Sequence, residues 1–182
     1  MIKLGVNTVL FKAYSFKEAA KAIKTAGYDG LEISAIKGMC EHLDLDNWKA
    51  QRNDIKGVME ECGLMMLSSE VASLDEERLL KAFEAGAEIG IPVINIGPGG
   101  KANNEDDLKA TLDKIAKMSE KASEFGVALC VKAHVGAAIY NTQTTLKAMD
   151  YVKSSAFGID MDPSHIYRAG ELPEDALPEV IS

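Results

Sequence analysis

Two predicted buried strands end in side chains that could do chemistry. One, near residue 130, finishes with Lys132 and His134, and the other, near residue 160, carries Asp160, Asp162 and then His165. Side chains at alternate positions of a strand point to the same face, so each pair shares a face of its strand. A carboxylate is costly to bury without a cation or hydrogen-bond donors, which makes Lys132 the expected partner of the acids. If the strands are neighbours, these side chains reach one hollow.

Four glycines mark the helices that would position these strands. Gly27, Gly63, Gly90 and Gly126 each end a predicted amphipathic helix and precede a short apolar strand. This repeat is typical of parallel strands that are buried on both faces. A complete eight-unit barrel takes roughly 250 residues, or about 31 per unit, so 182 residues supply about six units. The sequence therefore predicts an α/β fold, a (β/α) barrel of the TIM type, which forms a single domain over residues 1–182 and lacks its C-terminal units.

The predicted strands and helices alternate along the whole chain. Helices are expected to begin at two capping boxes, Ser15 to Glu18 and Ser73 to Glu76, and the proline after Asp162 predicts a loop. Strands are expected at residues 2–6, 28–33, 64–68, 92–96, 127–134 and 157–162, and helices at 16–26, 47–62, 76–89, 104–125 and 146–152, with the start of another at 175–181. A doubly wound open sheet is the alternative, but no glycine-rich phosphate fingerprint follows the first strand.

The composition narrows the class of partner. Hydrophobic residues make up 47% of the chain and charged residues 26%, as in an ordinary globular domain. The 28 acids exceed the 20 bases and give a net charge of -8, which disfavours a nucleic-acid partner. No apolar run approaches the ~20 residues of a membrane helix, and the chain enters a strand pattern at once, without a signal peptide, so we expect a cytoplasmic protein with no membrane partner. Three widely spaced cysteines fit neither a disulfide framework nor a zinc knuckle.

Three short segments resemble a known family. They are Ala-Gly-Tyr-Asp-Gly-Leu-Glu-Ile at 26–33, Val-Lys-Ala-His at 131–134, and Asp-Pro-Ser-His at 162–165 with Gly170 after it. In this order and spacing the chain resembles the xylose isomerase-like barrel superfamily of sugar and sugar-phosphate isomerases and epimerases. The resemblance spans the whole chain.

The resemblance implies a divalent metal, which polarises a substrate carbonyl and steadies the enediolate that forms when a base removes the neighbouring proton. Asp162 matches the aspartate ligand on the sixth strand. His165 matches a histidine that touches substrate oxygens or the metal shell, and Glu32 matches a glutamate at the pocket rim. The sequence departs from the family at Lys132, where the family has a glutamate ligand, and the last two ligands have no counterpart.

Lys132 and His134 leave several roles open. Lys132 could be a cation that makes a metal unnecessary, an amine nucleophile, or a structural partner of the acids. We favour the first role, because a fixed ammonium can stabilise an enediolate much as a metal does. His134 could be the general base or a metal ligand, since imidazole titrates near neutrality, or it could be hydrogen-bonded into the barrel wall.

We therefore expect an enzyme, a sugar or sugar-derivative isomerase or epimerase, which acts on a small-molecule carbohydrate by abstracting a proton next to a carbonyl. A phosphate or carboxylate group of the substrate could be bound by Arg168. The residues predicted to carry this function are Lys132, His134 and His165 for catalysis, Asn7, Glu32 and Arg168 for substrate binding, and Asp162 for a divalent metal (Mn, Mg or Zn).

Two other functions compete with this one. The chain could be a catalytically incomplete barrel fragment or subunit, and because an unclosed sheet exposes strand edges and apolar faces, we expect a homo-oligomer or a partner chain. A type II apurinic endonuclease is less favoured. Such an enzyme needs many histidines for its zinc ions, whereas the sequence has only His42, His134 and His165.

Overall fold

The sheet contains six parallel strands in chain order. The computed structural model describes residues 2–181, so Met1 and Ser182, the two ends of the predicted domain, lie outside the described residues. Hydrogen-bonded neighbours follow the order β1-β2-β4-β5-β6-β7, and the short strand β3 pairs with β2 in the antiparallel direction. The strands are β1 Gly5–Asn7, β2 Gly30–Ile36, β3 Cys40–Glu41, β4 Met65–Glu70, β5 Val93–Ile96, β6 Ala128–Lys132 and β7 Phe157–Asp160.

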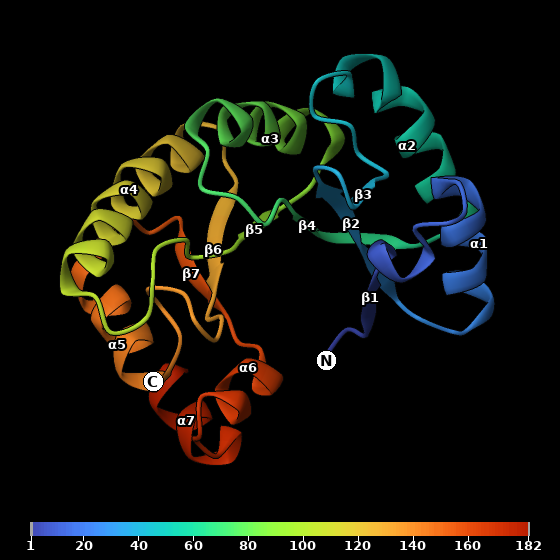
Figure 1. Cartoon of the computed structure of the whole chain (residues 1–182). Coiled ribbons are helices and arrows are strands. Elements are labelled where there is room, and N and C mark those ends of the chain that lie inside the picture. Colours follow the sequence, from blue (N-terminus) through green and yellow to red (C-terminus); the bar gives the residue numbers. More distant parts are fainter. Residues whose placement is uncertain (1, 182) are drawn as a thin grey trace.

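Helices connect the strands and form an outer layer around the sheet (Figure 1). None of the helices within residues 2–181 is both long and apolar enough to cross a bilayer. They are the 3-10 helix η1 Thr8–Phe11 and the α-helices α1 Phe16–Thr25, α2 Trp48–Cys62, α3 Glu76–Ile89, α4 Glu105–Glu124, α5 Thr142–Tyr151, α6 Pro163–Arg168 and α7 Pro173–Val180. The predicted TIM-type α/β fold with six βα units is confirmed.

The row of strands is curved but not closed. In Figure 1 the helices form an arc that remains open between β1 and the pair α6 and α7. Within residues 2–181, β1 pairs with β2 and β7 pairs with β6, and these two outer strands do not pair with each other. Residues 2–181 thus form an open, barrel-like sheet in which β1 and β7 are the outer strands.

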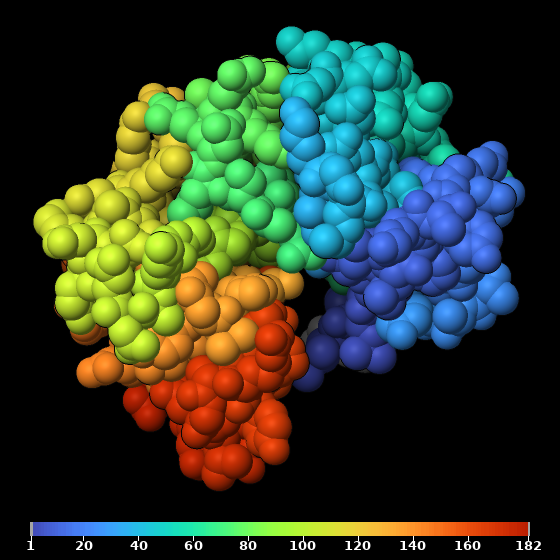
Figure 2. Space-filling view, in the orientation of Figure 1, coloured from blue at the N-terminus to red at the C-terminus, as the bar shows by residue number. Residues whose placement is uncertain are grey.

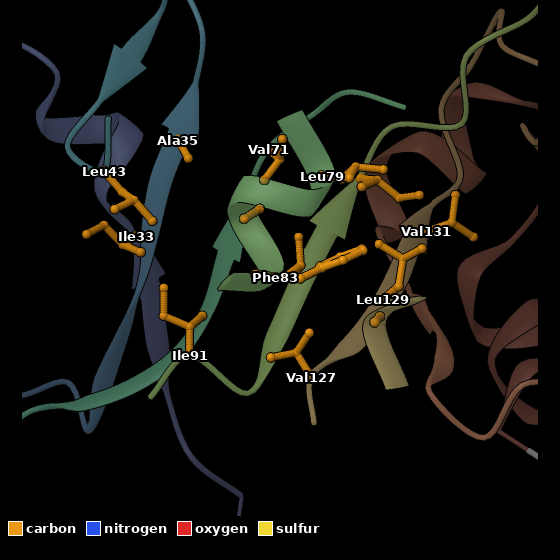
Figure 3. Close-up of a cluster of buried hydrophobic side chains, with 14 of the residues drawn as sticks. Ile33, Ala35, Leu43, Val71, Leu79, Phe83, Ile91, Val127, Leu129 and Val131 are labelled. Carbon is orange, nitrogen blue, oxygen red and sulfur yellow. The ribbon is translucent and has the colours of Figure 1, made fainter. Parts of the chain in front are cut away.

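The apolar core lies between the sheet and the outer helices. Along β2, Leu31 and Ile33 are fully buried, and along β6, Leu129 is fully buried against the same layer. Figure 3 shows Phe83 of α3 among the strand side chains that face this layer. Because successive strand residues point to opposite faces, the residues between these apolar positions, such as Glu32 and Lys132, point toward the inside of the barrel. The packing of the core therefore directs the polar side chains inward.

The ends of several elements differ from the predictions. The first capping box is present, with Ser15 and Glu18 exchanging hydrogen bonds, but the second is wrong: Asp75 caps α3, and Ser73 instead accepts a hydrogen bond from the Asp75 N–H. Asp75 is the N-cap because its carboxylate accepts a hydrogen bond from the backbone N–H of Arg78, three residues into the helix.

The segment after β7 is a helix and not the predicted loop. Strand β7 ends at Asp160, two residues before the predicted end. Asp162 is the N-cap of α6, and its carboxylate accepts a hydrogen bond from the backbone N–H of Ser164. Pro163 occupies the first helical position, where its missing N–H costs no hydrogen bond and its fixed φ suits the helix. The proline therefore starts a helix, where the sequence predicted a loop.

Candidate functional site

The carboxyl ends of β6 and β7 lie side by side. Lys132 pairs in register with Asp160, and a cleft of about 660 Å³ beyond these ends is lined by Lys132, His134, Asp162 and His165. The sequence predicted that these four residues share one hollow, and the structure brings them together. Figure 2 shows this face of the molecule hollowed between the blue N-terminal segment and the orange and red C-terminal segments. Loop residues that follow β4 and β5, among them Ser73 and Pro98, complete the wall.

The mouth of the cleft, defined here as His134, Asp162 and His165, lies past the last residues of the strands. The two imidazole rings are stacked at a tilt, with centroids 4.0 Å apart and an interplanar angle of 37°. His165 is placed by α6 and His134 by the loop after β6. Burial and the neighbouring His134 lower the pKa of His165, and the carboxylate of Asp162 opposes them.

The floor of the cleft is centred on Lys132. Its Nζ lies 3.2 Å from Oε1 of Glu70 and 3.4 Å from Oδ2 of Asp160. These three side chains are only 21%, 17% and 28% exposed, so water screens their attraction less than at an open surface. Burial by itself lowers the pKa of Lys132, but the carboxylates of Asp160 and Glu70 together outweigh it and raise the pKa. The lysine is therefore a fixed cation at neutral pH, which disfavours its role as a neutral amine nucleophile.

Hydrogen bonds extend the floor to Glu32. The Nδ2 of Asn7 donates to Oε2 of Glu70 at 2.6 Å and to Oε2 of Glu32 at 2.7 Å. The Oε1 of Glu32 accepts from Ser68 at 3.0 Å and from Asn95 at 2.6 Å. Burial raises the pKa of Glu32, and these hydrogen bonds only partly offset it. We call Asn7, Glu32, Glu70, Lys132 and Asp160 the floor from here on; Glu70 and Lys132 line the cleft itself, and the other three line a separate, smaller cavity.

Three residues predicted to bind substrate lie elsewhere than expected. Glu32 and Asn7 do not line the cleft; they line a smaller inner cavity of about 210 Å³ together with Asp160. Glu32 lies in the middle of β2, and the barrel rim begins only after Ile36, so its expected rim position is wrong. Arg168 is exposed in the last turn of α6 and lines neither cavity. The roles of these residues stay predictions.

Glu70 is the site residue that the sequence reasoning missed. The third strand was expected to end at Ser68, whereas β4 continues to Glu70. Glu70 alternates with Ser68 and so points inward with it, and its carboxylate joins Lys132 to Asn7. The signal was an acid two residues beyond the predicted strand end, at the carboxyl edge of a parallel sheet.

The ligand atoms available near Asp162 do not fit the predicted divalent metal. Its Oδ1 already accepts from the backbone N–H and the hydroxyl of Ser164, at 2.9 and 2.7 Å. Burial raises the pKa of Asp162, but these hydrogen bonds prevail and lower it. In the described part of the chain, no three His, Cys, Asp or Glu residues are grouped to hold a metal ion. The position of the expected glutamate ligand carries the ammonium of Lys132, which repels a cation.

Comparisons with known proteins agree with this fold. Residues 20–181 match the family model for the xylose isomerase-like TIM barrel. No curated protein matches the chain significantly. Among solved structures, the probable 3-DHS dehydratase AsbF from Bacillus anthracis is 14% identical with a TM-score of 0.81, and the alignment covers 99% of this chain and 70% of that chain.

Two further solved structures have the same fold. D-psicose 3-epimerase is 14% identical with a TM-score of 0.80, covering 98% of this chain and 70% of that chain. A xylose isomerase-like TIM barrel protein from Mycobacterium smegmatis, in complex with magnesium, is 12% identical with a TM-score of 0.80, covering 98% of this chain and 71% of that chain. At such identities the likeness establishes the fold and not the activity.

Proposed function

Because the chain belongs to the xylose isomerase-like TIM barrel family, we propose that it is an isomerase or epimerase that acts on a sugar or sugar derivative. It removes a proton from the carbon next to a carbonyl and stabilises the enediolate that results. The observation that carries this proposal is one cleft at the carboxyl end of the parallel strands, which holds a cation, Lys132, beside two histidines. Active sites of this fold lie at that end of the strands.

The residues of the chain divide the work of this reaction. Lys132 remains charged beside Glu70 and Asp160, so its ammonium can stabilise the oxygen that becomes negative when the proton leaves. His134 and His165 lie at the mouth, where an imidazole can take up and return a proton near neutral pH. A cleft of about 660 Å³ is in the range of pockets that bind small molecules.

A divalent metal is implied by the family, and when bound it would polarise the carbonyl. The ligand atoms near Asp162 do not fit such an ion, so no step of the proposed reaction uses a metal ion. We propose instead that Lys132 supplies the positive charge, which is the role favoured for it from the sequence. The dehydratase and the epimerase among the similar structures make carbohydrate-like substrates a reasonable first choice for testing.

The test is proton exchange at the substrate carbon, which reports on the first step even when little product accumulates. Ketoses and keto-sugar derivatives are incubated in D₂O, and deuterium next to the carbonyl is followed by NMR, with and without EDTA or added Mn²⁺. We expect wild-type protein to catalyse exchange, and Lys132→Met to reduce it about 10²- to 10³-fold through loss of oxyanion stabilisation. Lys153→Met, at a lysine whose side chain is 75% exposed, is the matched control and should leave exchange unchanged. Full exchange activity in Lys132→Met would contradict the proposal.

A second candidate, a subunit that needs a partner chain, is favoured by the open barrel. β1 and β7 leave free edges, and exposed apolar side chains flank the opening, including Leu4 before β1 and Tyr167 and Leu172 near α6 and α7. Paired edges would shield this surface from aggregation. We propose association through these edges, and light scattering that finds a stable monomer at all concentrations would contradict it.

A further inference from the structure

The backbone of one residue, Val135, contacts both histidines of the mouth. Its N–H donates to Nδ1 of His165 at 3.4 Å, and its carbonyl oxygen lies 3.0 Å from Nδ1 of His134. A backbone N–H can only donate and a carbonyl can only accept. Nδ1 of His165 must therefore present its lone pair, whereas Nδ1 of His134 must carry a hydrogen. In their neutral forms the two rings are opposite tautomers.

We propose that the Val135 peptide fixes a division of labour in which Nε2 of His134 is the general base and Nε2–H of His165 is the hydrogen-bond donor to the substrate oxygen. The tautomers follow from the contacts of Val135 alone, and the chemical roles rest on the function proposed above. Which nitrogen of a histidine carries its proton is set by the hydrogen bond that the other nitrogen makes. Here a single peptide group sets both.

Each remaining nitrogen is available to a substrate. Nε2 of His165 lies 4.0 Å from Oδ2 of Asp162, which is too long for a hydrogen bond, so its N–H has no hydrogen-bond acceptor in the described chain. Nε2 of His134 has no hydrogen-bond partner among residues 2–181, and its side chain is exposed at the cleft. The mouth therefore presents one free lone pair, on Nε2 of His134, and one free N–H, on Nε2 of His165.

The charges around His165 keep it in the donor form. Burial is the largest cause that lowers its pKa. His134, Arg168 and Lys132 lower the pKa further, whereas the carboxylate of Asp162 raises it. Protonation would also place a hydrogen on Nδ1, directly against the N–H of Val135, and so would break that hydrogen bond. The contact with Val135 and the surrounding charges therefore both favour the neutral form of His165.

The step balances without any other reactant. The lone pair on Nε2 of His134 takes the proton from the carbon next to the carbonyl, and the electron pair of the broken C–H bond becomes the C=C bond of the enediolate. The carbonyl π electrons move to oxygen, which is held by Nε2–H of His165 and the ammonium of Lys132. For isomerisation, the His134 imidazolium gives the proton to the former carbonyl carbon, and the hydroxyl proton of the enediolate moves to the oxygen held by His165 and Lys132, so the other oxygen becomes the new carbonyl. For epimerisation, the enediolate turns its other face to His134, the imidazolium protonates the same carbon there, and the charge on oxygen returns to the C=O bond.

The direct test is NMR of the free protein labelled with ¹⁵N-histidine, at a pH where the rings are neutral. The chain has three histidines, and long-range ¹H–¹⁵N correlations distinguish their tautomers. Nε2 of His42 lies 2.9 Å from the carbonyl oxygen of Tyr14, so His42 is an internal reference for the Nε2–H form. We expect His165 to match His42 and His134 to be the single Nδ1–H ring. His134→Gln and His165→Gln assign the signals, and an Nε2–H form for His134 or an Nδ1–H form for His165 would overturn the proposal.

Backbone variants test whether Val135 is the cause. Val135→Pro removes the N–H, so we expect His165 to become a mixture of tautomers while His134 is unchanged. Val135→Ala keeps the peptide group and should leave both rings as in the wild type, whereas a changed tautomer in Val135→Ala would contradict a role for the backbone. If Val135→Pro does not fold, the wild-type tautomers still test whether both rings have the form that the contacts with Val135 require.

The roles are tested by the pH profile of deuterium exchange. His134→Gln should lower kcat/KM for exchange by about 10²- to 10⁴-fold and remove the fall in rate at acid pH that reports protonation of the base. His165→Gln should lower kcat but keep that acid limb. Loss of the limb in His165→Gln instead would overturn the division. Absence of exchange in the wild type would refute the proposed function and leave the tautomer result standing, so the two failures are distinguishable.

Discussion

The floor and the mouth share strands β6 and β7, but polar groups are paired in the floor and left partly unpaired in the mouth. In the floor, Lys132 has a carboxylate on either side, and Asn7 joins Glu70 to Glu32. In the mouth, His134 and His165 each keep one nitrogen without a hydrogen-bond partner among residues 2–181. The difference follows from position, because floor residues lie within strands where burial requires pairing, and mouth residues lie beyond the strand ends.

The floor carries more negative charge than its cation can balance. Three carboxylates, on Glu32, Glu70 and Asp160, surround one ammonium. Burial raises the pKa of Asp160, and the attraction of Lys132 offsets this only in part. Removal of a floor residue should therefore change stability, whereas removal of a mouth residue should change mainly the chemistry.

Lys132→Met gives the largest effect expected from this comparison. It leaves Glu70 and Asp160 buried without their cation, so we expect the free energy of unfolding at pH 7 to fall by about 3 kcal/mol. Without the lysine, the folded-state pKa of Asp160 rises further above its ordinary value of 3.8. The variant therefore recovers stability as the pH falls and the carboxyls take up protons.

Urea unfolding of Lys132→Met between pH 4 and 8 measures this loss, and His134→Gln is the control from the mouth. The His134 side chain is exposed, and among residues 2–181 its ring makes one hydrogen bond, to the Val135 carbonyl, and one stacking contact, with His165. Its replacement should therefore change the free energy of unfolding by less than about 0.5 kcal/mol. An equal loss of unfolding free energy in the two variants would contradict the distinction between floor and mouth.

Glu32→Gln should give a smaller effect, visible in its pH dependence. Burial raises the pKa of Glu32 above its ordinary value of 4.5, so the folded protein prefers the protonated form. This contribution to stability is fully present below pH 4.5 and is lost as the pH rises through the folded-state pKa. The glutamine side chain of the variant does not titrate. The free energy of unfolding of the wild type, relative to the variant, should therefore increase as the pH falls toward 4.5.

Glu18→Gln is a control for Glu32→Gln with the opposite sign. Hydrogen bonds from Ser15 in the capping box lower the pKa of Glu18, so its contribution is present above pH 4.5 and is lost as the pH falls. Urea unfolding at several pH values should give difference curves that slope in opposite directions. Parallel curves for the two variants would show that burial does not dominate at Glu32.

The sequence predicted the scaffold well because its signals are repeated along the chain. Apolar strands recur in each unit, and helix-ending glycines, such as Gly63 and Gly90 with their left-handed backbone, recur in the first four. The neighbouring positions of β6 and β7 then placed Lys132 and Asp160 together. Repetition of this kind fixes which strands are neighbours and which face each residue occupies.

The predictions failed where tertiary contacts decide the end of an element. Glu70 belongs to β4 because it pairs in register with Asn95 of β5, and no local signal in the run Ser-Ser-Glu indicates a strand. Helix α6 has six residues, too few for a periodic pattern, so its proline predicted a loop. Glu32 was expected at the rim because sequence shows the inward face of a strand but not the depth along it.

Substitution of Asp162 should give the smallest change, and it distinguishes the helix-capping role of this residue from a metal-binding role. As N-cap of α6 it can be replaced by Asn with little loss, because Asn caps a helix about as well, whereas Ala should cost about 1 kcal/mol. Since α6 carries His165, Asp162→Ala should also reduce deuterium exchange by loosening that ring, and Asp162→Asn should retain most of it. A carboxylate that anchored a divalent ion would behave differently: the Asn variant would keep its stability but lose its activity, as Ala does. Urea unfolding and exchange rates of both variants therefore decide whether this acid serves the helix or a metal.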